Sequence, residues 1–328
     1  MQLGLTWQHN QPEGELDEWE RALELRPQWT KFSVTMGNGQ KHFEEETIPW
    51  CEDLARHGVR PVIDLRTGDI SSFARSAPPV DWRWDLALKR FVNERLFGGF
   101  AEWAGSIVSA LGGLCSHYEV WGECGCMYAG QRFFDGGTYP KMLAAVYPAI
   151  KQASPEAKVW FGGHGLNGNV NFWQYAMQQG AGGYHNYNNL HCFMHDREWG
   201  KVEELLRGMF GTIRRIEVET RGDPQRPLAM TEFGWPSHPD GGGIPFKSYV
   251  VDSVLSCSEE EQAAWLDASL KLFEEEGVRV VIIDKLRDGK GDHWGAHCGL
   301  YREDWTAKPA VEVFRAWAEK GAGTEVSF

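Results

Sequence analysis

The feature that most constrains the fold is an alternation of short apolar strands with amphipathic helices, repeated eight times along 328 residues. We expect strands at 3–9, 29–36, 59–65, 117–123, 158–161, 189–194, 228–231 and 278–283. Helices are expected at 15–25, 43–57, 85–111, 139–152, 171–179, 198–220, 259–276 and 309–320. Such alternation requires right-handed crossovers and a parallel sheet, and eight units close a barrel. The sequence therefore predicts an α/β fold, a single (β/α)8 TIM barrel that spans residues 1–328 as one domain.

A doubly wound sheet would also alternate strands with helices, but its usual nucleotide-binding signature is missing. No Gly-x-Gly-x-x-Gly follows the first expected strand, and there is no phosphate-binding loop. The composition, with 42% hydrophobic and 24% charged residues, is that of a globular protein with a sizeable core. The closed barrel is therefore the preferred architecture.

The net charge and the hydropathy of the chain limit the kinds of partner that the protein is expected to bind. The net charge of −13 argues against nucleic acid and anionic membranes, because both partners require a basic face. No apolar run approaches the length of about 18 residues that a membrane-spanning helix needs. We expect a neutral or small substrate, no nucleic acid and no membrane.

The cysteines and the amino terminus bear on the compartment. Seven cysteines, an odd number without framework spacing, do not predict a disulfide scaffold. The segment from Met1 to Trp7 shows no basic region and no cleavage site, so a reducing, cytoplasmic location is expected. Cys124-Gly125-Cys126 has one residue between its thiols, whereas zinc sites usually have two to four. This pattern predicts buried thiols and no metal.

Two glutamates stand at the ends of expected strands. Within the segment from Pro227 to Trp235, an apolar run leads directly to Glu232, and the expected fourth strand ends at Glu123. Because barrel enzymes carry their chemistry at the carboxyl ends of the strands, we expect both side chains at one mouth. Glycosidic bonds are cleaved by two carboxyl groups, held about 5–5.5 Å apart in enzymes that retain configuration. The pair therefore predicts glycoside hydrolysis.

The segments around these glutamates resemble a known group of enzymes. Tyr-Glu-Val-Trp-Gly-Glu at 118–123 and Met-Thr-Glu-Phe-Gly-Trp at 230–235 are similar to the acid/base and nucleophile motifs of clan A retaining glycoside hydrolases. That clan includes the cellulase/mannanase and xylosidase/iduronidase families. The run from Gly299 to Ala310 resembles their approach to the last helix. The resemblance implies that Glu123 is the general acid/base and Glu232 the nucleophile, with no cofactor.

One position departs from the pattern of that clan. The clan normally has Asn immediately before the acid/base, where it bonds the 2-hydroxyl of the sugar, and here the residue is Gly122. A hydrogen bond that strengthens in the transition state is then missing or comes from elsewhere in the chain.

Further polar and aromatic residues are expected around the mouth, where they would orient hydroxyls and stack sugar rings. Tryptophan is unusually abundant, at 16 residues, and suits the C–H faces of sugars. The predicted substrate-binding residues are His9, Asp64, Arg66, Trp121, His164, Asn167, His191, His195, Trp235, Asp284, Lys285 and Trp294.

The sequence thus predicts a retaining glycosidase that acts on a carbohydrate. Two alternatives stay open: a carbohydrate-binding barrel without catalysis, suggested by Gly122 and the tryptophans, and a metal-dependent hydrolase that uses His164, His191 and His195. The sugar, the linkage and the mode of cleavage depend on the loops at 71–84, 237–256 and 286–306, for which no fold is predicted.

Overall fold

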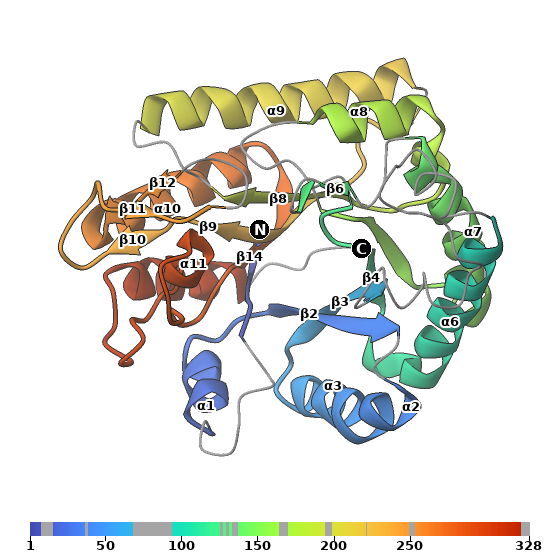
Figure 1. Cartoon of the computed structure of the whole chain (residues 1–328), viewed down its shortest axis with the longest axis horizontal. Helices are drawn as coiled ribbons and strands as arrows, with labels where there is room; N and C mark the ends of the chain where they lie inside the picture. The colour runs from blue at the N-terminus through green and yellow to red at the C-terminus, as the bar shows by residue number, and fades with distance from the viewer. Residues whose placement is uncertain are drawn as a thin grey trace.

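Eight parallel strands form one sheet in the computed structural model, and they curve into a nearly closed barrel (Figure 1). The structure describes residues 1–7, 16–36, 39–67, 94–124, 127–128, 131–132, 137–163, 170–193, 199–220, 222–248 and 253–322. The barrel strands are β1 (Gln2–Leu5), β2 (Trp29–Met36), β3 (Arg60–Thr67), β4 (His117–Val120), β7 (Lys158–Phe161), β8 (Asn188–Phe193), β9 (Leu228–Gly234) and β14 (Val278–Ile283). The predicted (β/α)8 fold is confirmed.

The strand order is β7-β4-β3-β2-β1-β14-β9-β8, so the sheet runs almost once around the axis. Its two ends meet where Trp160 of β7 bridges Tyr187, just before β8, in parallel register. The backbone N–H of Phe161 donates to the Tyr187 carbonyl at 3.1 Å across this seam. All eight carboxyl ends therefore face the same mouth.

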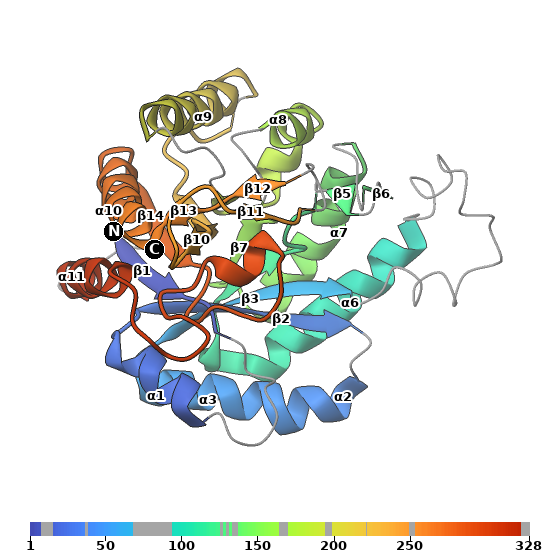
Figure 2. The same ribbon diagram turned by 60° about the vertical axis from the view of Figure 1, so that its left-hand side comes forward.

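Helices surround the barrel, as the two views in Figures 1 and 2 show. They are α1 (Leu16–Glu24), α2 (Gly39–His42) continued by a π-helical turn (Phe43–Thr47) and α3 (Ile48–Arg56), α6 (Glu94–Leu111), α7 (Thr138–Ala153), α8 (Asn171–Gln178), α9 (Trp199–Glu219), α10 (Glu259–Glu275) and α11 (Ala310–Ala322). Short 3-10 turns lie at Gly112–Leu114, Ala181–Gly183 and Trp294–His297. The start of α10 follows from its sequence, because Ser258 and Glu261 form a reciprocal capping box.

Several expected strand ends differ from the structure. The first strand ends at Leu5, before the expected end at 9, and the third and sixth end at Thr67 and Phe193. Two further differences bear on the site. The fourth strand ends at Val120, so Glu123 lies in the turn after β4 and not on the strand. The seventh strand continues past Thr231 to Gly234, so Glu232 lies within β9. The expected loop at 71–84 and the first part of the helix expected at 85–111 lie outside the described residues.

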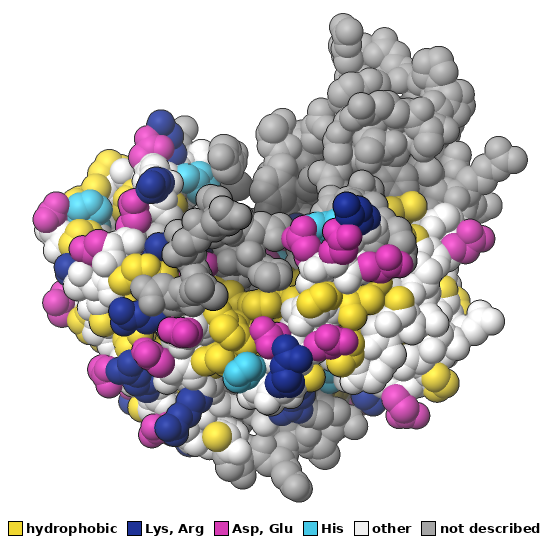
Figure 3. Space-filling view, turned by 90° about the horizontal axis from the view of Figure 1, so that it is seen from below, with side chains coloured by type: hydrophobic (Ala, Val, Ile, Leu, Met, Phe, Trp, Pro, Cys, Tyr) yellow, Lys and Arg dark blue, Asp and Glu magenta, His cyan; other side chains and the backbone are white. Residues whose placement is uncertain are grey.

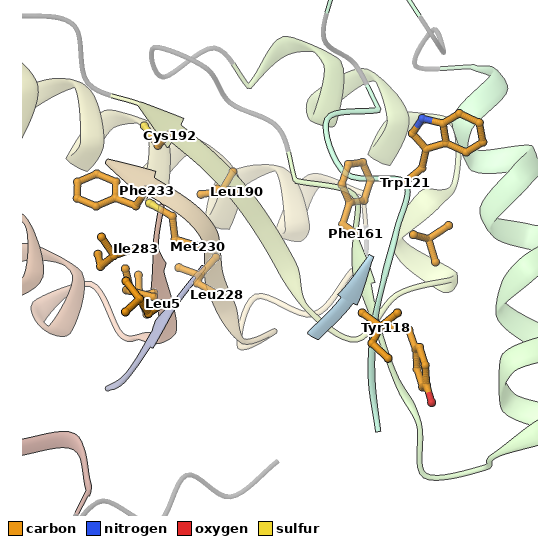
Figure 4. Packing of buried hydrophobic residues seen from close by; sticks show 14 of the residues in the cluster. Leu5, Tyr118, Trp121, Phe161, Leu190, Cys192, Leu228, Met230, Phe233 and Ile283 are labelled. Atoms are coloured by element: carbon orange, nitrogen blue, oxygen red, sulfur yellow. The ribbon is translucent and has the colours of Figure 1, made fainter. Parts of the chain in front are cut away.

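Two hydrophobic clusters divide the interior. The larger one fills the space between strands and helices, and Figure 4 shows part of it around Leu5, Met230, Phe233 and Ile283. The smaller one lies inside the barrel, and we call it the floor. The floor consists of Trp29, Val62, Trp160, Tyr187, Ala229, Val280 and Ile282.

The loops beyond the strands contain small ribbons. After β9, β10 (Ser237–His238) pairs with β13 (Cys257–Ser258), and β11 (Pro245–Phe246) pairs with β12 (Val254–Leu255). After β4, β5 (Met127–Tyr128) pairs with β6 (Gln131–Arg132). One face of the molecule shows acidic and basic side chains interspersed over its described part (Figure 3). None of the described helices combines the length and the apolar character needed to cross a bilayer.

Candidate active site

A β-bulge in β9 directs Glu232 into the barrel. Strict alternation from Ala229, which lies in the floor, would place Thr231 inside and Glu232 outside. The register between β8 and β9 shifts here, since Leu190 pairs with Met230 but His191 pairs with Glu232. One extra residue in β9 lets two consecutive side chains point inward. Thr231 and Glu232 both contact groups inside the barrel. Phe233 instead packs outward against Phe273 of α10, with the ring centroids 4.9 Å apart.

Glu123 reaches the same space from the turn after β4. Trp121 and Glu123 adopt left-handed backbone conformations, with φ of 61° and 58°, and flank Gly122. Such φ values are uncommon outside glycine and often occur in functional turns. The backbone N–H of Glu123 donates to the Gly163 carbonyl at 2.7 Å, which fixes the turn on the end of β7. The Glu123 side chain is 13% exposed and that of Glu232 is 21% exposed, so both carboxylates are open to the mouth.

The structure brings the two glutamates together. One carboxylate oxygen of Glu123, one of Glu232 and a ring nitrogen of His191 lie within 4.8 Å of one another. His191 Nδ1 lies 3.3 Å from Glu232 Oε2 and 3.7 Å from Glu123 Oε1, so the imidazole stands between the two acids. The ring fits closely beside β7, because a Cβ at Gly163 would lie 1.9 Å from its Cδ2.

A layer of charged side chains that includes Glu232 lies just inside the mouth of the barrel. Lys31 Nζ is 2.8 Å from Glu232 Oε1, 3.0 Å from Glu119 Oε2 and 2.9 Å from His191 Nε2. Lys31, Glu119 and His191 come from the second, fourth and sixth barrel strands, and alternate strands contribute to one layer of a barrel interior. We call Lys31, Glu119, His191 and Glu232 the charged layer. All four are buried except the tip of Glu232.

Glu119 is the fully buried acid of the charged layer, and it has four polar partners. Besides Lys31 it pairs with His191 Nε2 at 3.1 Å, and it accepts hydrogen bonds from the Gly163 N–H at 2.7 Å and the Thr231 hydroxyl at 2.9 Å. Burial alone would raise the pKa of Glu119, but Lys31 and His191 outweigh burial and hold it well below its usual range. Glu119 therefore stays ionised and serves as a fixed counter-charge.

The two carboxylates of the layer stabilise its two cations, although Lys31 Nζ, 2.9 Å from His191 Nε2, acts to lower the pKa of His191. Although burial acts in the opposite direction, the Glu232 and Glu119 carboxylates raise the pKa of His191 to about 9. Burial would raise the pKa of Glu232, yet His191 and Lys31 lower it. Against the burial that disfavours its charge, Glu119 and Glu232 raise the pKa of Lys31. At neutral pH the layer consists of two cations and two anions.

Asp64 and Arg66 occupy the mouth beside Glu123. Asp64 of β3 is fully buried, and its Oδ1 accepts a hydrogen bond from the Gly122 N–H at 2.8 Å. Its Oδ2 accepts from the Ser33 hydroxyl at 3.2 Å and from Arg66 Nη2. The Arg66 side chain is 32% exposed, so its guanidinium lies at the boundary between the protein and the mouth.

On the opposite side of the mouth, Asp284 and Lys285 follow β14. Asp284 Oδ1 accepts a hydrogen bond from the Thr6 hydroxyl at 2.6 Å, and burial raises its pKa, with the Glu232 carboxylate acting in the same direction against Lys285. Trp294 is partly exposed and contacts Phe193, at the end of β8, with the ring centroids 4.8 Å apart. Among the described tryptophans that were predicted to bind substrate, Trp294 has the ring that is most accessible to a sugar.

Two other predicted stacking residues lie in the core. Trp235 is 2% exposed and packs against Trp265 of α10 with ring centroids 4.8 Å apart. Trp121 is 8% exposed and packs against Phe100 of α6, and Figure 4 shows its ring on the helical side of the sheet. Their rings are covered by helices, so neither presents a face to the mouth. The predicted residues His9, His164, Asn167 and His195 lie outside the described part of the chain.

The group formed by Glu123, His191 and Glu232 is a candidate metal site. Two carboxylates and one imidazole within 4.8 Å are a donor set that zinc accepts. A metal ligand must be a neutral imidazole, so a cation bound here would displace the proton of His191. Lys31 Nζ, 2.8 Å from Glu232 Oε1 and 2.9 Å from His191 Nε2, already places a positive charge beside this donor set. Of the cysteine pair, Cys124 is buried with its thiol directed at the Gly162 carbonyl, and Cys126 lies outside the described residues.

Lys31 and Glu119 were not predicted from the sequence. Both occupy inward positions of strands whose outward neighbours, Phe32 and Tyr118, pack in the outer core. A lysine within one strand and a glutamate within another are a usable signal, because a buried charge needs a partner of opposite sign. Pairing them requires knowing that strands two and four share a layer, which the sequence supplies only after the barrel is assumed.

Comparison with known proteins bears on the fold. No family model matches the sequence, and no curated protein matches it. A family 39 glycoside hydrolase from the gut symbiont Bacteroides cellulosilyticus WH2 superposes with a TM-score of 0.69 at 14% identity, covering 97% of this chain and 63% of that one. An exo-beta-1,4-mannosidase from Opitutaceae bacterium strain TAV5 gives a TM-score of 0.70 at 13% identity, covering 98% of this chain and 59% of that one.

A third solved structure is a variant of the GH5_18 protein from Bifidobacterium longum subsp. longum ATCC 55813, in complex with Manb1-4GlcNAc. Its TM-score is 0.70 at 13% identity, and the match covers 99% of this chain and 79% of that one. The chain thus spans about three fifths of the length of the first two structures. These matches confirm, at the level of fold, the resemblance to clan A that the two glutamate motifs indicate. The chain has the barrel fold of glycoside hydrolases of families 5 and 39.

Proposed function

We propose that the protein is a glycosidase that cleaves O-glycosidic bonds with retention of configuration. The observation that carries the proposal is the approach of a Glu123 oxygen to within 4.8 Å of a Glu232 oxygen at the carboxyl end of the barrel. Retaining glycosidases hold their two carboxyl groups about 5–5.5 Å apart, whereas inverting enzymes need about 6.5–9.5 Å to admit a water between them. The closeness of the pair favours the retaining arrangement.

The surroundings of the two acids assign their roles. Glu232 accepts a hydrogen bond from Lys31 Nζ and has a lowered pKa, so it is a carboxylate ready to attack the anomeric carbon. Glu123 has no such direct lysine contact among the described residues, and its nearest cation is His191 Nδ1 at 3.7 Å. Two carboxyl groups in unequal environments are suited to unequal roles. Glu123 is therefore the proton donor.

The reaction proceeds in two displacements. Glu232 bonds to the anomeric carbon while the bond from that carbon to the leaving oxygen breaks and Glu123 gives this oxygen its proton. Glu123, now a carboxylate, then takes a proton from water, whose oxygen displaces Glu232 from the sugar. The products are the free sugar and the alcohol. Both glutamates return to their starting state, so the chemistry requires no cofactor.

The similar structures support the class of substrate. They include a family 39 glycoside hydrolase and a mannosidase, and the GH5_18 structure was solved with Manb1-4GlcNAc. In this chain the partly exposed Trp294 offers an aromatic face close to β8, which suits the C–H face of a sugar ring. We assign a carbohydrate substrate on these grounds.

A panel of 4-nitrophenyl glycosides tests the proposal. Glu232→Ala should lower turnover of the best glycoside by at least about 1,000-fold, because the nucleophile is lost. Glu123→Ala should lower it comparably and regain rate with azide, which attacks the glycosyl-enzyme without needing a base. Glu319→Ala, which changes an exposed glutamate of α11, serves as the matched control and should keep full activity.

Covalent trapping supplies a second readout. A 2-deoxy-2-fluoro glycoside of the active sugar should add one glycosyl mass, and peptide mapping should place it on Glu232. Labelling at another residue, or full turnover by Glu232→Ala, would exclude the assigned mechanism.

A binding barrel without catalysis is the second candidate, and Gly122 is the observation that favours it. In that case calorimetry would detect binding of a glycoside that the protein never turns over. Turnover that is unchanged by a chelator would exclude a metal-dependent hydrolase.

A further inference from the structure

The side chain missing at position 122 has its place filled by Arg66. A Cβ built on Gly122 would lie 2.7 Å from Arg66 Nη2, 2.8 Å from Asp64 Oδ2 and 3.0 Å from Glu119 Oε1. Contacts this short require the neighbouring groups to move. Glycine at this position is therefore coupled to the presence of the Arg66–Asp64 pair.

Asp64 holds this guanidinium in a fixed orientation. Oδ1 of Asp64 is tied to the Gly122 N–H, and Oδ2 receives both the Ser33 hydroxyl and Arg66 Nη2. Because Asp64 is fully buried, its direction is set by these three bonds. A charged donor held in this way is preorganised, since it loses little freedom when it binds a ligand.

Arg66 also keeps donors available. A guanidinium has five N–H groups, and Asp64 is the hydrogen-bond partner of this one among the described residues. The side chain is 32% exposed, so part of it faces the mouth. Its charge is already balanced by Asp64, which favours a neutral hydroxyl of a sugar over a carboxylate or sulfate.

We infer that Arg66 is the specificity-determining residue for the sugar hydroxyl on the carbon next to the anomeric carbon. This inference rests on the proposed function. The guanidinium lies beside the residue that precedes Glu123, and Glu123 and Glu232 together define the position of the anomeric carbon. The nearest sugar hydroxyl is the one on the adjacent carbon. A hydrogen bond to that hydroxyl strengthens in the transition state of glycoside cleavage.

Paired substrates test the assignment. 4-Nitrophenyl β-D-glucopyranoside and β-D-mannopyranoside differ only at this carbon and share one 2-deoxy counterpart, and other active sugars of the panel are compared with their own. Arg66→Met should lower kcat/KM for the 2-hydroxy glycoside by about 10- to 100-fold, the value of a charge-assisted hydrogen bond. It should leave the rate for the 2-deoxy glycoside nearly unchanged.

Two further variants separate this role from a structural one. Arg214→Met, which removes the arginine–carboxylate pair of Arg214 in α9 with Glu276, should not change the ratio of the two rates. The conservative variant Arg66→Lys keeps a cationic donor beside Asp64 and should keep part of the preference for the 2-hydroxy glycoside. Thermal unfolding shows whether each variant is folded.

The failure of this inference can be told from the failure of the proposed function. Equal losses on the two glycosides in Arg66→Met would overturn the inference, while the glycosidase would stand if Glu232→Ala still abolishes turnover of both. If the wild-type protein turns over neither glycoside of any pair, both the role of Arg66 and the proposed glycosidase function are overturned.

Discussion

The floor and the charged layer lie in the same barrel, with the charged layer nearer the mouth, yet their chemistry is opposite. In the floor, Trp160 stacks on Tyr187 with ring centroids 4.4 Å apart and an interplanar angle of 11°. One inward position further along β2, the apolar Trp29 gives way to Lys31. The strands therefore provide a packed apolar base and, above it, a set of charges that the base keeps away from water.

The floor mainly stabilises the barrel, whereas the charged layer forms part of the candidate active site. Burying aromatic area in the floor contributes favourably without any partner requirement. Burying four charged groups is costly unless every one is paired, and each member of the charged layer contacts at least two others of opposite or complementary kind. We expect substitutions in the floor to change stability alone, and substitutions in the charged layer to change both stability and rate.

The largest effect is expected from Lys31→Met. Removing this cation leaves Glu119 and Glu232 with one buried cation between them, and breaking a buried ion pair costs about 3–5 kcal/mol of unfolding free energy. The rate of glycoside cleavage should fall as well, because Glu232 loses the donor that lowers its pKa. Urea denaturation and kcat/KM on the best panel glycoside measure the two effects.

The double variant Lys31→Met with Glu119→Met is the matched control. It removes one charge of each sign and leaves His191 paired with Glu232, so most of the lost stability should return while the rate stays low. A single variant as stable as the wild type would show that the charged layer is not a closed set of ion pairs.

His191 should give the protein a pH-dependent stability of intermediate size. Its pKa is raised to about 9 from an ordinary value near 6.5, so its contribution is complete below about pH 6.5 and is lost as the pH rises through 9. The linkage amounts to on the order of 3 kcal/mol. Urea denaturation at several pH values between about 6 and 10 measures it against His191→Gln, in which the decline should be smaller. Identical pH profiles for the two proteins would mean that His191 is neutral in the native state.

The smallest effect is expected in the floor, from Trp160→Phe. The substitution leaves a small cavity and removes the hydrogen bond from Trp160 Nε1 to His117 Nδ1 at 3.1 Å, so about 2 kcal/mol of stability should be lost. Burial lowers the pKa of His117 to about 3, with Arg60 and Lys158 acting in the same direction, so this ring remains neutral. Since the floor lies below the charged layer, kcat/KM should be unchanged. A change in rate comparable to that of Lys31→Met would remove the distinction between the two regions.

The sequence by itself determined the barrel and the meeting of two acids. Three expected strands, Trp29–Met36, Lys158–Phe161 and Val278–Ile283, match the structure residue for residue. They were predictable because a buried parallel strand is a short apolar run between breakers, and that signal is local. Once eight such units were recognised, barrel closure alone placed Glu123 and Glu232 at one mouth.

Only the tertiary structure decided how those acids are held. The bulge that turns Glu232 inward depends on the register of β9 against its neighbours. The local sequence around Thr231 contains no pattern that predicts this bulge. Lys31 meets Glu119 across 88 positions of sequence, and Arg66 fills the space beside Gly122 from another strand. These contacts depend on register and layer, which are properties of strand pairing around the whole barrel, whereas strand and helix propensity are properties of neighbouring residues.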